Sequence, residues 1–330
     1  MESTGYRLGN QVVLVHGAHA SALYDLFDGR IQRVSSGLGK VLEGVDGHAD
    51  VPGKYDASVL ESLLRRLAER GFLERCQGNG GQRYSFDSKV PRFPPLRTLS
   101  FEIGSGTTAE DFGRILNFIA DASRRFSLGS FAFLVGGSCD PAGGLEAVVA
   151  SGLRHARFSI CELWCASEAV GRFKALRSRL PHPGRVFVSE ACDPVHGTIG
   201  VDEGGVRSVW DWDAGLLPSA MVCRADYYHL LGMYAECYGC LHFDRDWNVF
   251  PDVSEMDFFI GRPGAGVGLD DLLRDERLLG YWKVGKDRRD KCRDCELRYA
   301  CPNPLSRRSR PDRLGSAPAN CSYDLERGRW

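Results

Sequence analysis

The pattern of apolar and polar positions near the start of the chain predicts three short strands. Gln11–Val15 is a mostly apolar strand-like run, Ala22–Phe27 alternates apolar and polar positions, and Arg30–Val34 follows as a third strand. Asp28-Gly29, between the second and third segments, is a dipeptide typical of a two-residue hairpin turn. We therefore expect an antiparallel arrangement in which Arg30–Val34 is the third strand.

The same region then changes to helical spacing. A helix is expected from Ser36 to about Gly47, and a second from Ser58 to Arg70. Asp56 is a candidate N-cap for the second helix, and Gly71 a candidate stop. The apolar stripe of that helix consists of Val59, Leu60, Leu63, Leu64 and Leu67.

Three strands, two helices and a short wing built from "FLERC" and "QRYSF" predict a winged-helix-like domain over residues 1–90. Such a domain serves as a structural cap, a DNA reader or a peptide reader. Binding to DNA is disfavoured, because the cations Arg65, Arg66 and Arg70 have Glu61 and Glu69 beside them.

Residues 91–225 alternate strand-like and helix-like stretches about every 30 residues, which predicts βαβ connections and a mostly parallel sheet. Four such units are too few for a complete eight-unit barrel. We therefore expect an α/β protein with an open or partial βα barrel in its middle. Thr108 and Asp111 form an acceptable capping box for one of these helices.

This middle region lacks a recognisable catalytic signature. "VGGSCDPAGG" fits neither dinucleotide-binding nor P-loop spacing. Cys161 and Cys165 are spaced C-x3-C, but Glu168 stands where a radical S-adenosylmethionine enzyme has its third cysteine. We expect both cysteines to be buried core thiols.

Residues 226–330 are expected to form a small cysteine-rich, metal-binding domain. Cys292, Cys295 and Cys301, together with Cys321, supply the four thiolates of a tetrahedral site. Nearby cations are expected to lower the thiol pKa values; they are Lys283, Lys286, Arg288, Arg289, Lys291 and Arg293. A possible second site consists of Cys237, Cys240 and His242, although two packed thiols are the simpler interpretation.

Length, charge and composition limit the number of domains, the kind of partner and the expected location of the protein. The chain has 330 residues, enough for two or three domains, and a formal net charge of -1, so no overall field favours nucleic acid. No apolar run reaches the roughly 18–20 residues of a membrane span, and "MESTGYRLGNQ" does not have the order of a signal peptide. We expect a cytoplasmic protein whose twelve cysteines are thiols and metal ligands.

The N-terminal pattern "YDLFDGRIQRVSSGLGKVLEGVDG…LLRRLAERGFLE" resembles the RiPP recognition element of enzymes that modify ribosomally made peptides. The resemblance implies that a leader peptide adds as a strand beside Arg30–Val34, with the helix Ser58–Arg70 as the other wall. The implied peptide-binding residues are Arg30, Ile31, Gln32, Arg33, Val34, Leu63, Arg66, Leu67 and Arg70.

The C-x2-C-x5-C pattern in "YWKVGKDRRDKCRDCELRYAC", followed by a distant cysteine, resembles the second-cluster half of a SPASM domain. With "VHGAHASALYDL", it looks most like the SPASM-type maturases encoded beside ATP-grasp ligases. Leu305 and Phe250 stand where that family has further cysteines. One complete site without a radical triad favours structural zinc, with a [4Fe-4S] cluster as the alternative and no S-adenosylmethionine expected.

Three functions fit these observations. The first is a non-catalytic protein that binds a precursor peptide and presents it to a partner enzyme, an ATP-grasp ligase, with neither nucleic acid nor membrane as partner. The second is a peptide-modifying enzyme that uses strand-end groups, with Glu102, Cys161, Glu190 and Asp193 as candidates. The third is a winged-helix regulator with a metal-sensing tail.

Overall fold

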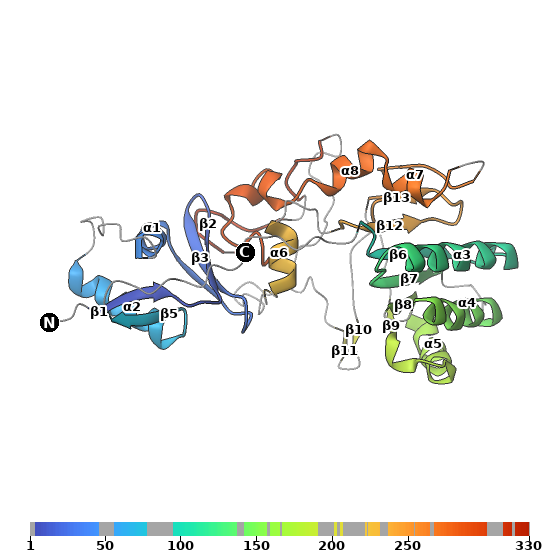
Figure 1. Ribbon diagram of the computed structural model, residues 1–330, viewed down its shortest axis with the longest axis horizontal. Helices are drawn as coiled ribbons and strands as arrows, with labels where there is room; N and C mark the ends of the chain where they lie inside the picture. Colours follow the sequence, from blue (N-terminus) through green and yellow to red (C-terminus); the bar gives the residue numbers. More distant parts are fainter. Residues whose placement is uncertain are drawn as a thin grey trace.

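The structure is a computed structural model. It describes residues 4–45, 56–77, 95–136, 142–156, 159–165, 167–190, 201–202, 205–206, 222, 224–231, 237–253, 255–264, 267–301, 313–318 and 321–329. Elements from the first 77 residues gather at one end of the molecule, and those of residues 98–190 at the other (Figure 1). The C-terminal part, coloured orange to red, extends from the second group back to the first.

The N-terminal group contains an antiparallel sheet with the order β2-β3-β4. Its strands are β2 (Val12–His16), β3 (Ala20–Asp25) and β4 (Ile31–Ser35). Gly29 in the turn before β4 has a φ of 72°, a left-handed conformation that glycine adopts without strain. The three predicted strands are therefore confirmed, with ends that shift by one or two residues. The predicted two-residue turn is wrong: the Asp25 N–H donates to the Arg30 carbonyl, so the turn spans residues 26–29.

Two helices cover one face of this sheet. They are α1 (Ser36–Val45) and α2 (Ala57–Glu69), and Leu42 and Leu64 pack with Leu23 of β3 in one buried cluster. The Asp56 side chain accepts hydrogen bonds from the Ser58 and Val59 backbone N–H groups, which confirms the predicted N-cap.

The expected wing differs from the prediction. β5 (Leu73–Gln77) pairs antiparallel with β1 (Thr4–Leu8). The segment "QRYSF" at residues 82–86 lies outside the described residues. The pairing of β5 with β1 was not predicted, because the two strands are 65 or more residues apart and no local sequence pattern connects them. The available signal was in β1, where the buried residues Tyr6 and Leu8 alternate as strand residues do.

The second group is built on a six-stranded sheet with the order β13-β12-β6-β7-β8-β9, parallel except for the pair β12–β13. Its strands are β6 (Thr98–Ile103), β7 (Ser130–Val135), β8 (Ile160–Cys165), β9 (Val186–Glu190), β12 (Cys240–Phe243) and β13 (Val249–Phe250). The predicted mostly parallel sheet is thus confirmed. Two of its strands come from beyond residue 225, so the sheet crosses the expected domain boundary.

Three helices lie along one side of this sheet (Figure 1): α3 (Ala109–Arg125), α4 (Ala142–His155) and α5 (Ser167–Arg179). Burial alternates along β6, so that Leu99, Phe101 and Ile103 enter the core with residues of α3 and α4. Cys161 and Cys165 are fully buried in the same core, as predicted. The side chains of Ser100 and Glu102 belong to the other face of the sheet.

The remaining described elements are short. They are η1 (Pro183–Arg185), β10 (Val201–Asp202), β11 (Gly205–Val206), α6 (Arg224–Leu231), α7 (Leu269–Leu273), α8 (Glu276–Trp282), η2 (Lys286–Arg288) and η3 (Cys292–Asp294). Within the described part of the chain, none of the helices is long and apolar enough to cross a membrane.

The predicted capping box at the start of α3 is confirmed and provides a test of stability. Asp111 accepts from the Thr108 backbone N–H and from Trp247 Nε1, and the Thr108 bond is the main cause of its lowered pKa. Asp111→Asn should lower the free energy of unfolding by about 1 kcal/mol at pH 7. The carboxylate contributes fully above its unfolded pKa of about 3.9, and its contribution is lost as pH falls through the lower folded value.

Urea unfolding at pH 7 and pH 3 measures this effect, with Glu110→Gln as the matched control on the same helical turn. If the difference in the free energy of unfolding between wild type and Asp111→Asn were the same at both pH values, the stabilising role of the ionised Asp111 carboxylate would be contradicted.

Candidate functional site

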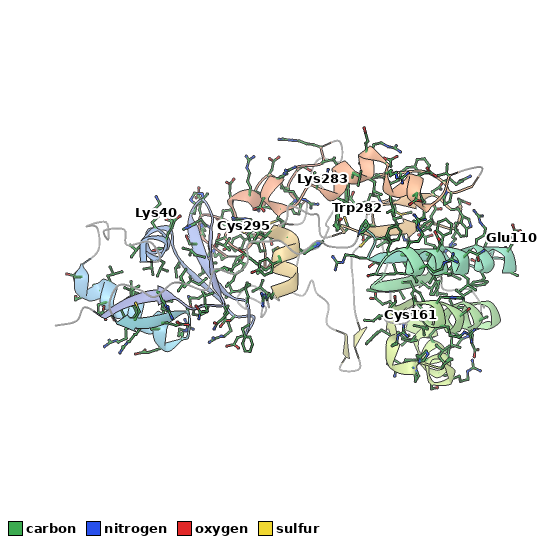
Figure 2. The ribbon with its side chains drawn as sticks, viewed as in Figure 1. Lys40, Glu110, Cys161, Trp282, Lys283 and Cys295 are labelled. Carbon is green, nitrogen blue, oxygen red and sulfur yellow. The ribbon has the colours of Figure 1, made fainter. Side chains whose placement is uncertain are left out.

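The four cysteines of the predicted metal site line one small cavity. Cys292 begins η3 and Cys295 follows it, whereas Cys301 and Cys321 come from further along the chain. The cavity has a volume of about 20 Å³. Lys286, Lys291 and Arg298 also line it. The structure therefore brings the four thiols and three cations to one place, close to the N-terminal sheet (Figure 2).

The expected effect of the cations on the thiols is wrong. Burial raises the pKa of Cys292 and of Cys295 to about 12, and the attraction of Lys286 and Arg289 for the Cys292 thiolate is too weak to reverse this. The Lys286 and Lys291 ammonium groups donate instead to the backbone carbonyls of Cys301 and Cys321, at 2.7 Å and 2.8 Å. These lysines thus fix the chain that carries the thiols.

The possible second site is not assembled. Cys240 and His242 lie on β12, where His242 Nδ1 is 2.9 Å from the Ser100 hydroxyl, and Cys237 lies beside the Tyr281 hydroxyl. Across the described residues, no three His, Cys, Asp or Glu side chains converge as the ligands of a single ion do. The four thiols of the C-terminal segment surround their cavity without meeting at one point.

Glu296, next to Cys295, joins this segment to the N-terminal sheet. Its carboxylate is 1% exposed and accepts from Arg33 Nε at 2.5 Å and from the Tyr323 hydroxyl at 2.6 Å. The Tyr24 hydroxyl of β3 donates to the Glu296 carbonyl at 2.7 Å. The sequence analysis missed Glu296; an acidic residue between two cysteines of a basic segment was the available signal.

Backbone contacts continue this junction. Ala18 N donates to the Asp294 carbonyl at 2.8 Å, and Arg298 Nη1 donates to the His16 carbonyl at 2.7 Å. A Cβ atom on Gly17 would lie 2.6 Å from Glu296 N, so only glycine permits this approach. The β2–β3 turn therefore packs directly against the chain between Cys292 and Cys321, which we call the cysteine segment.

The predicted peptide edge is β4, whose only neighbour among the described strands is β3. The C-terminal end of α2 lies beside it, because Arg30 Nη1 donates to the Arg70 carbonyl at 2.8 Å and Arg70 Nη1 donates to the Gln32 side chain. Leu63 and Arg66 lie on α2, about two turns and about one turn before Arg70. Edge strand and helix end thus lie side by side, as the resemblance implied.

The nine implied peptide-binding residues nevertheless divide between two faces of the sheet. Val34 and Leu67 are buried in the core beneath α2, which leaves them to support the edge from inside. Ile31 and Arg33 belong to the opposite face, where Ile31 packs against the cluster that contains Tyr24 and Arg33 pairs with Glu296. Arg30, Gln32 and Arg70 lie at the junction of strand and helix, whereas Leu63 packs against the core cluster and Arg66 is exposed on α2.

The strand-end candidates for catalysis also separate. Glu102, the last but one residue of β6, lines a cavity of about 200 Å³. Cys161 lies near the beginning of β8 and is buried in the core, so its expected place at a reactive strand end is wrong. β9 ends at Glu190, whose side chain lies outside the described set, as does Asp193.

The Glu296 junction predicts a large and specific loss of stability. Glu296→Ala leaves the Arg33 guanidinium and the Tyr323 hydroxyl without their shared acceptor, which should cost roughly 2–4 kcal/mol. In a double-mutant cycle with Arg33→Ala, the two losses should be less than additive by at least about 1 kcal/mol. Chemical denaturation measures both, with the exposed Glu326→Ala as control; additive losses would show that the two side chains are not coupled.

Comparisons with known proteins do not add a family. No protein-family model matches the chain, and no curated protein matches it. Two crystal structures of BtrN are similar, one in complex with AdoMet and 2-DOIA and one of the selenomethionine protein in an open conformation. Each is 9% identical with a TM-score of 0.33, and they cover 62% and 61% of this chain and 98% and 92% of their own. Similarity at this level carries no argument about fold or function.

Proposed function

We propose that this protein binds the leader segment of a ribosomally made precursor peptide and presents the peptide to a partner modifying enzyme, an ATP-grasp ligase. The observation that carries the proposal is β4, a strand with one free edge among the described strands and the end of α2 alongside it. An extended peptide added there would gain affinity from backbone hydrogen bonds and specificity from side-chain pockets.

The charge beside this edge favours an acidic leader peptide. Arg66 and Arg70 are exposed, and neither forms an ion pair with a carboxylate among the described residues. Neighbouring Arg30 is already held by Asp25 and Asp28, at 2.7 Å and 2.9 Å. These two guanidinium groups, which have no carboxylate partner among the described residues, therefore supply the electrostatic part of the recognition, which orients the peptide and raises its association rate.

The cysteine cavity supports the second part of the proposal, a structural metal. Four thiols around one small cavity are a donor set that suits zinc. Because the thiols do not converge on one point, a [4Fe-4S] cluster is the alternative occupant. Either group would close the segment between Cys292 and Cys321 against the N-terminal sheet. The proposed role is mechanical support of the peptide edge, with no S-adenosylmethionine chemistry.

Catalysis by this chain alone is the second candidate function. One observation favours it: Glu102 lines a cavity at the end of parallel strands, where open α/β sheets commonly bind ligands. Mass spectrometry of the precursor after incubation with the purified protein, alone and with the partner enzyme, distinguishes the two functions. A mass change without the partner would favour the enzyme.

The peptide proposal predicts a specific effect of charge reversal. Arg66→Glu combined with Arg70→Glu should weaken leader binding at least tenfold, about 1.4 kcal/mol, because both unpaired cations beside β4 are inverted. Fluorescence anisotropy with a labelled leader, taken from short reading frames beside the gene, measures the Kd. Arg124→Glu on the distant helix α3 is the matched control. Equal affinity of all three proteins for every leader tested would overturn the proposed edge.

The metal proposal predicts stoichiometric metal in the protein as purified under anaerobic conditions. Cys321→Ser should release most of it and lower the thermal midpoint, whereas Cys76→Ser, at a thiol in β5 remote from the cavity, should change neither. Elemental analysis gives the metal, and a broad visible absorption band would identify an iron–sulfur cluster instead of zinc. Wild-type protein without metal would contradict this part of the proposal.

A further inference from the structure

A second cavity lies at the carboxyl ends of the parallel strands β6 and β12, far from the cysteine segment along the chain. Its volume is about 200 Å³, ten times that of the cysteine cavity. Glu102 and Phe101 of β6 and Phe243 of β12 contribute to its wall. The other lining residues are Gly106, Thr107, Asp111, Ile115, Asp244, Arg245, Asp246 and Trp247.

The lining of this cavity is acidic. It carries four carboxylates, those of Glu102, Asp111, Asp244 and Asp246, and one cation, Arg245. Two of the carboxylates have structural duties: Asp111 caps α3, and Asp244 accepts from the backbone and side chain of Asn248. The Glu102 side chain is 25% exposed and has no such duty. A negative charge therefore remains at the inner wall.

An independent feature points to the same carboxylate. His242 is completely buried on β12, and its Nδ1 atom is 2.9 Å from the Ser100 hydroxyl. Its other nitrogen, Nε2, has no hydrogen-bond partner in the described structure and lies 3.5 Å from Glu102 Oε1, too far for a good hydrogen bond. A buried polar atom without a partner costs free energy, so this wall is incomplete as it stands.

Arg245 lies across the mouth of the cavity. Its side chain is 58% exposed, and Nε is 3.8 Å from Glu102 Oε2, a loose ion pair. The guanidinium lies over Gly104 and Gly136, which follow β6 and β7; a Cβ atom on either would come within 2.8 Å of it. Because Gly104 and Gly136 have no side chain, the ends of β6 and β7 leave room for a guanidinium group beside Glu102.

The aromatic residues of the wall are packed against their own neighbours. Phe101 and Phe243 are stacked with centroids 4.9 Å apart, and Trp247 packs edge-on to Phe243. Arg114 places its guanidinium 3.9 Å from the Trp247 ring centroid. The carboxylates, and Glu102 above all, therefore supply the preference for an ammonium or guanidinium group.

We propose that this cavity binds an organic cation, a guanidinium or ammonium group, against Glu102, and that Arg245 occupies the position in the absence of that ligand. The cation comes either from a free small molecule or from a basic side chain of the captured peptide. Only the second source rests on the proposed function.

Calorimetric titration of the full chain with N-acetyl-arginine amide tests the site, with N-acetyl-citrulline amide as its uncharged isostere. We expect the arginine probe to bind at least tenfold more tightly. Glu102→Gln should abolish this preference, whereas Arg245→Gln should tighten binding several-fold by removing the internal competitor. Glu146→Gln, an exposed carboxylate of α4, is the control and should change nothing.

Equal binding of the two probes, or an unchanged preference in Glu102→Gln, would overturn the proposal. Weaker binding by Arg245→Gln would overturn the role of Arg245 as an internal substitute. Propylguanidine identifies the source: affinity equal to that of the arginine probe assigns a free small cation, and markedly weaker binding assigns a peptide side chain.

Leader binding by the same variants separates this proposal from the previous one. Glu102 and β4 belong to different groups of elements, so Glu102→Gln should leave the Kd for the leader peptide unchanged. In Glu102→Gln, loss of the preference for the arginine probe with unchanged leader binding would support the cavity proposal, and an unchanged preference would overturn it; neither result bears on the peptide edge.

Discussion

A single buried carboxylate holds the two ends of this chain together. Burial of Glu296 is favourable only because Arg33 and Tyr323 satisfy its side chain while Tyr24 satisfies its carbonyl. These partners come from β3, β4 and the last ten residues, so the interaction forms only when all three segments are in place. Removing any one of them leaves polar groups buried without partners.

This constraint decides which surface of the N-terminal sheet is available. One face is covered by α1 and α2, and the other packs against Leu297, Tyr299 and Tyr323 of the cysteine segment. With both faces occupied, the outer edges of β2 and β4 remain among the described strands, and the edge of β4 has the end of α2 beside it. A rigid edge lowers the entropy lost on binding, because the strand is ordered before the peptide arrives. Metal binding at the cysteines and peptide binding at β4 are therefore expected to be linked.

Local signals made much of this architecture predictable. The antiparallel strands around Gly29, the cap at Asp56 and the box at Thr108 involve residues within a few positions of one another, and all three formed as expected, although the turn at Gly29 is longer than the predicted two residues. The pairing of β1 with β5 and the position of β12 beside β6 were not predicted, because each depends on a partner more than 60 residues away. The gathering of Cys321 with the C-x2-C-x5-C segment followed from ligand chemistry and not from local pattern.

The candidate sites show the same limit. The sequence placed all of Arg30–Val34 at the peptide edge, because it could not reveal that Arg33 pairs with a carboxylate 263 positions later. The thiol pKa values were predicted in the wrong direction, since sequence shows neighbouring charges and hides burial. Glu102 was found from its place near a strand end. His242 was only a possible metal ligand, and its neighbour Ser100 was not foreseen because it is distant in sequence.

Hydrogen–deuterium exchange before and after removal of the proposed metal tests the central claim, that the cysteine segment (residues 292–321) supports the proposed peptide-binding edge. Loss of the metal should speed exchange of the amides of residues 20–35 while those of residues 98–103, in the other sheet, keep their protection. Unchanged protection of residues 20–35 in metal-free protein would show that the edge stands without this support and would contradict the account.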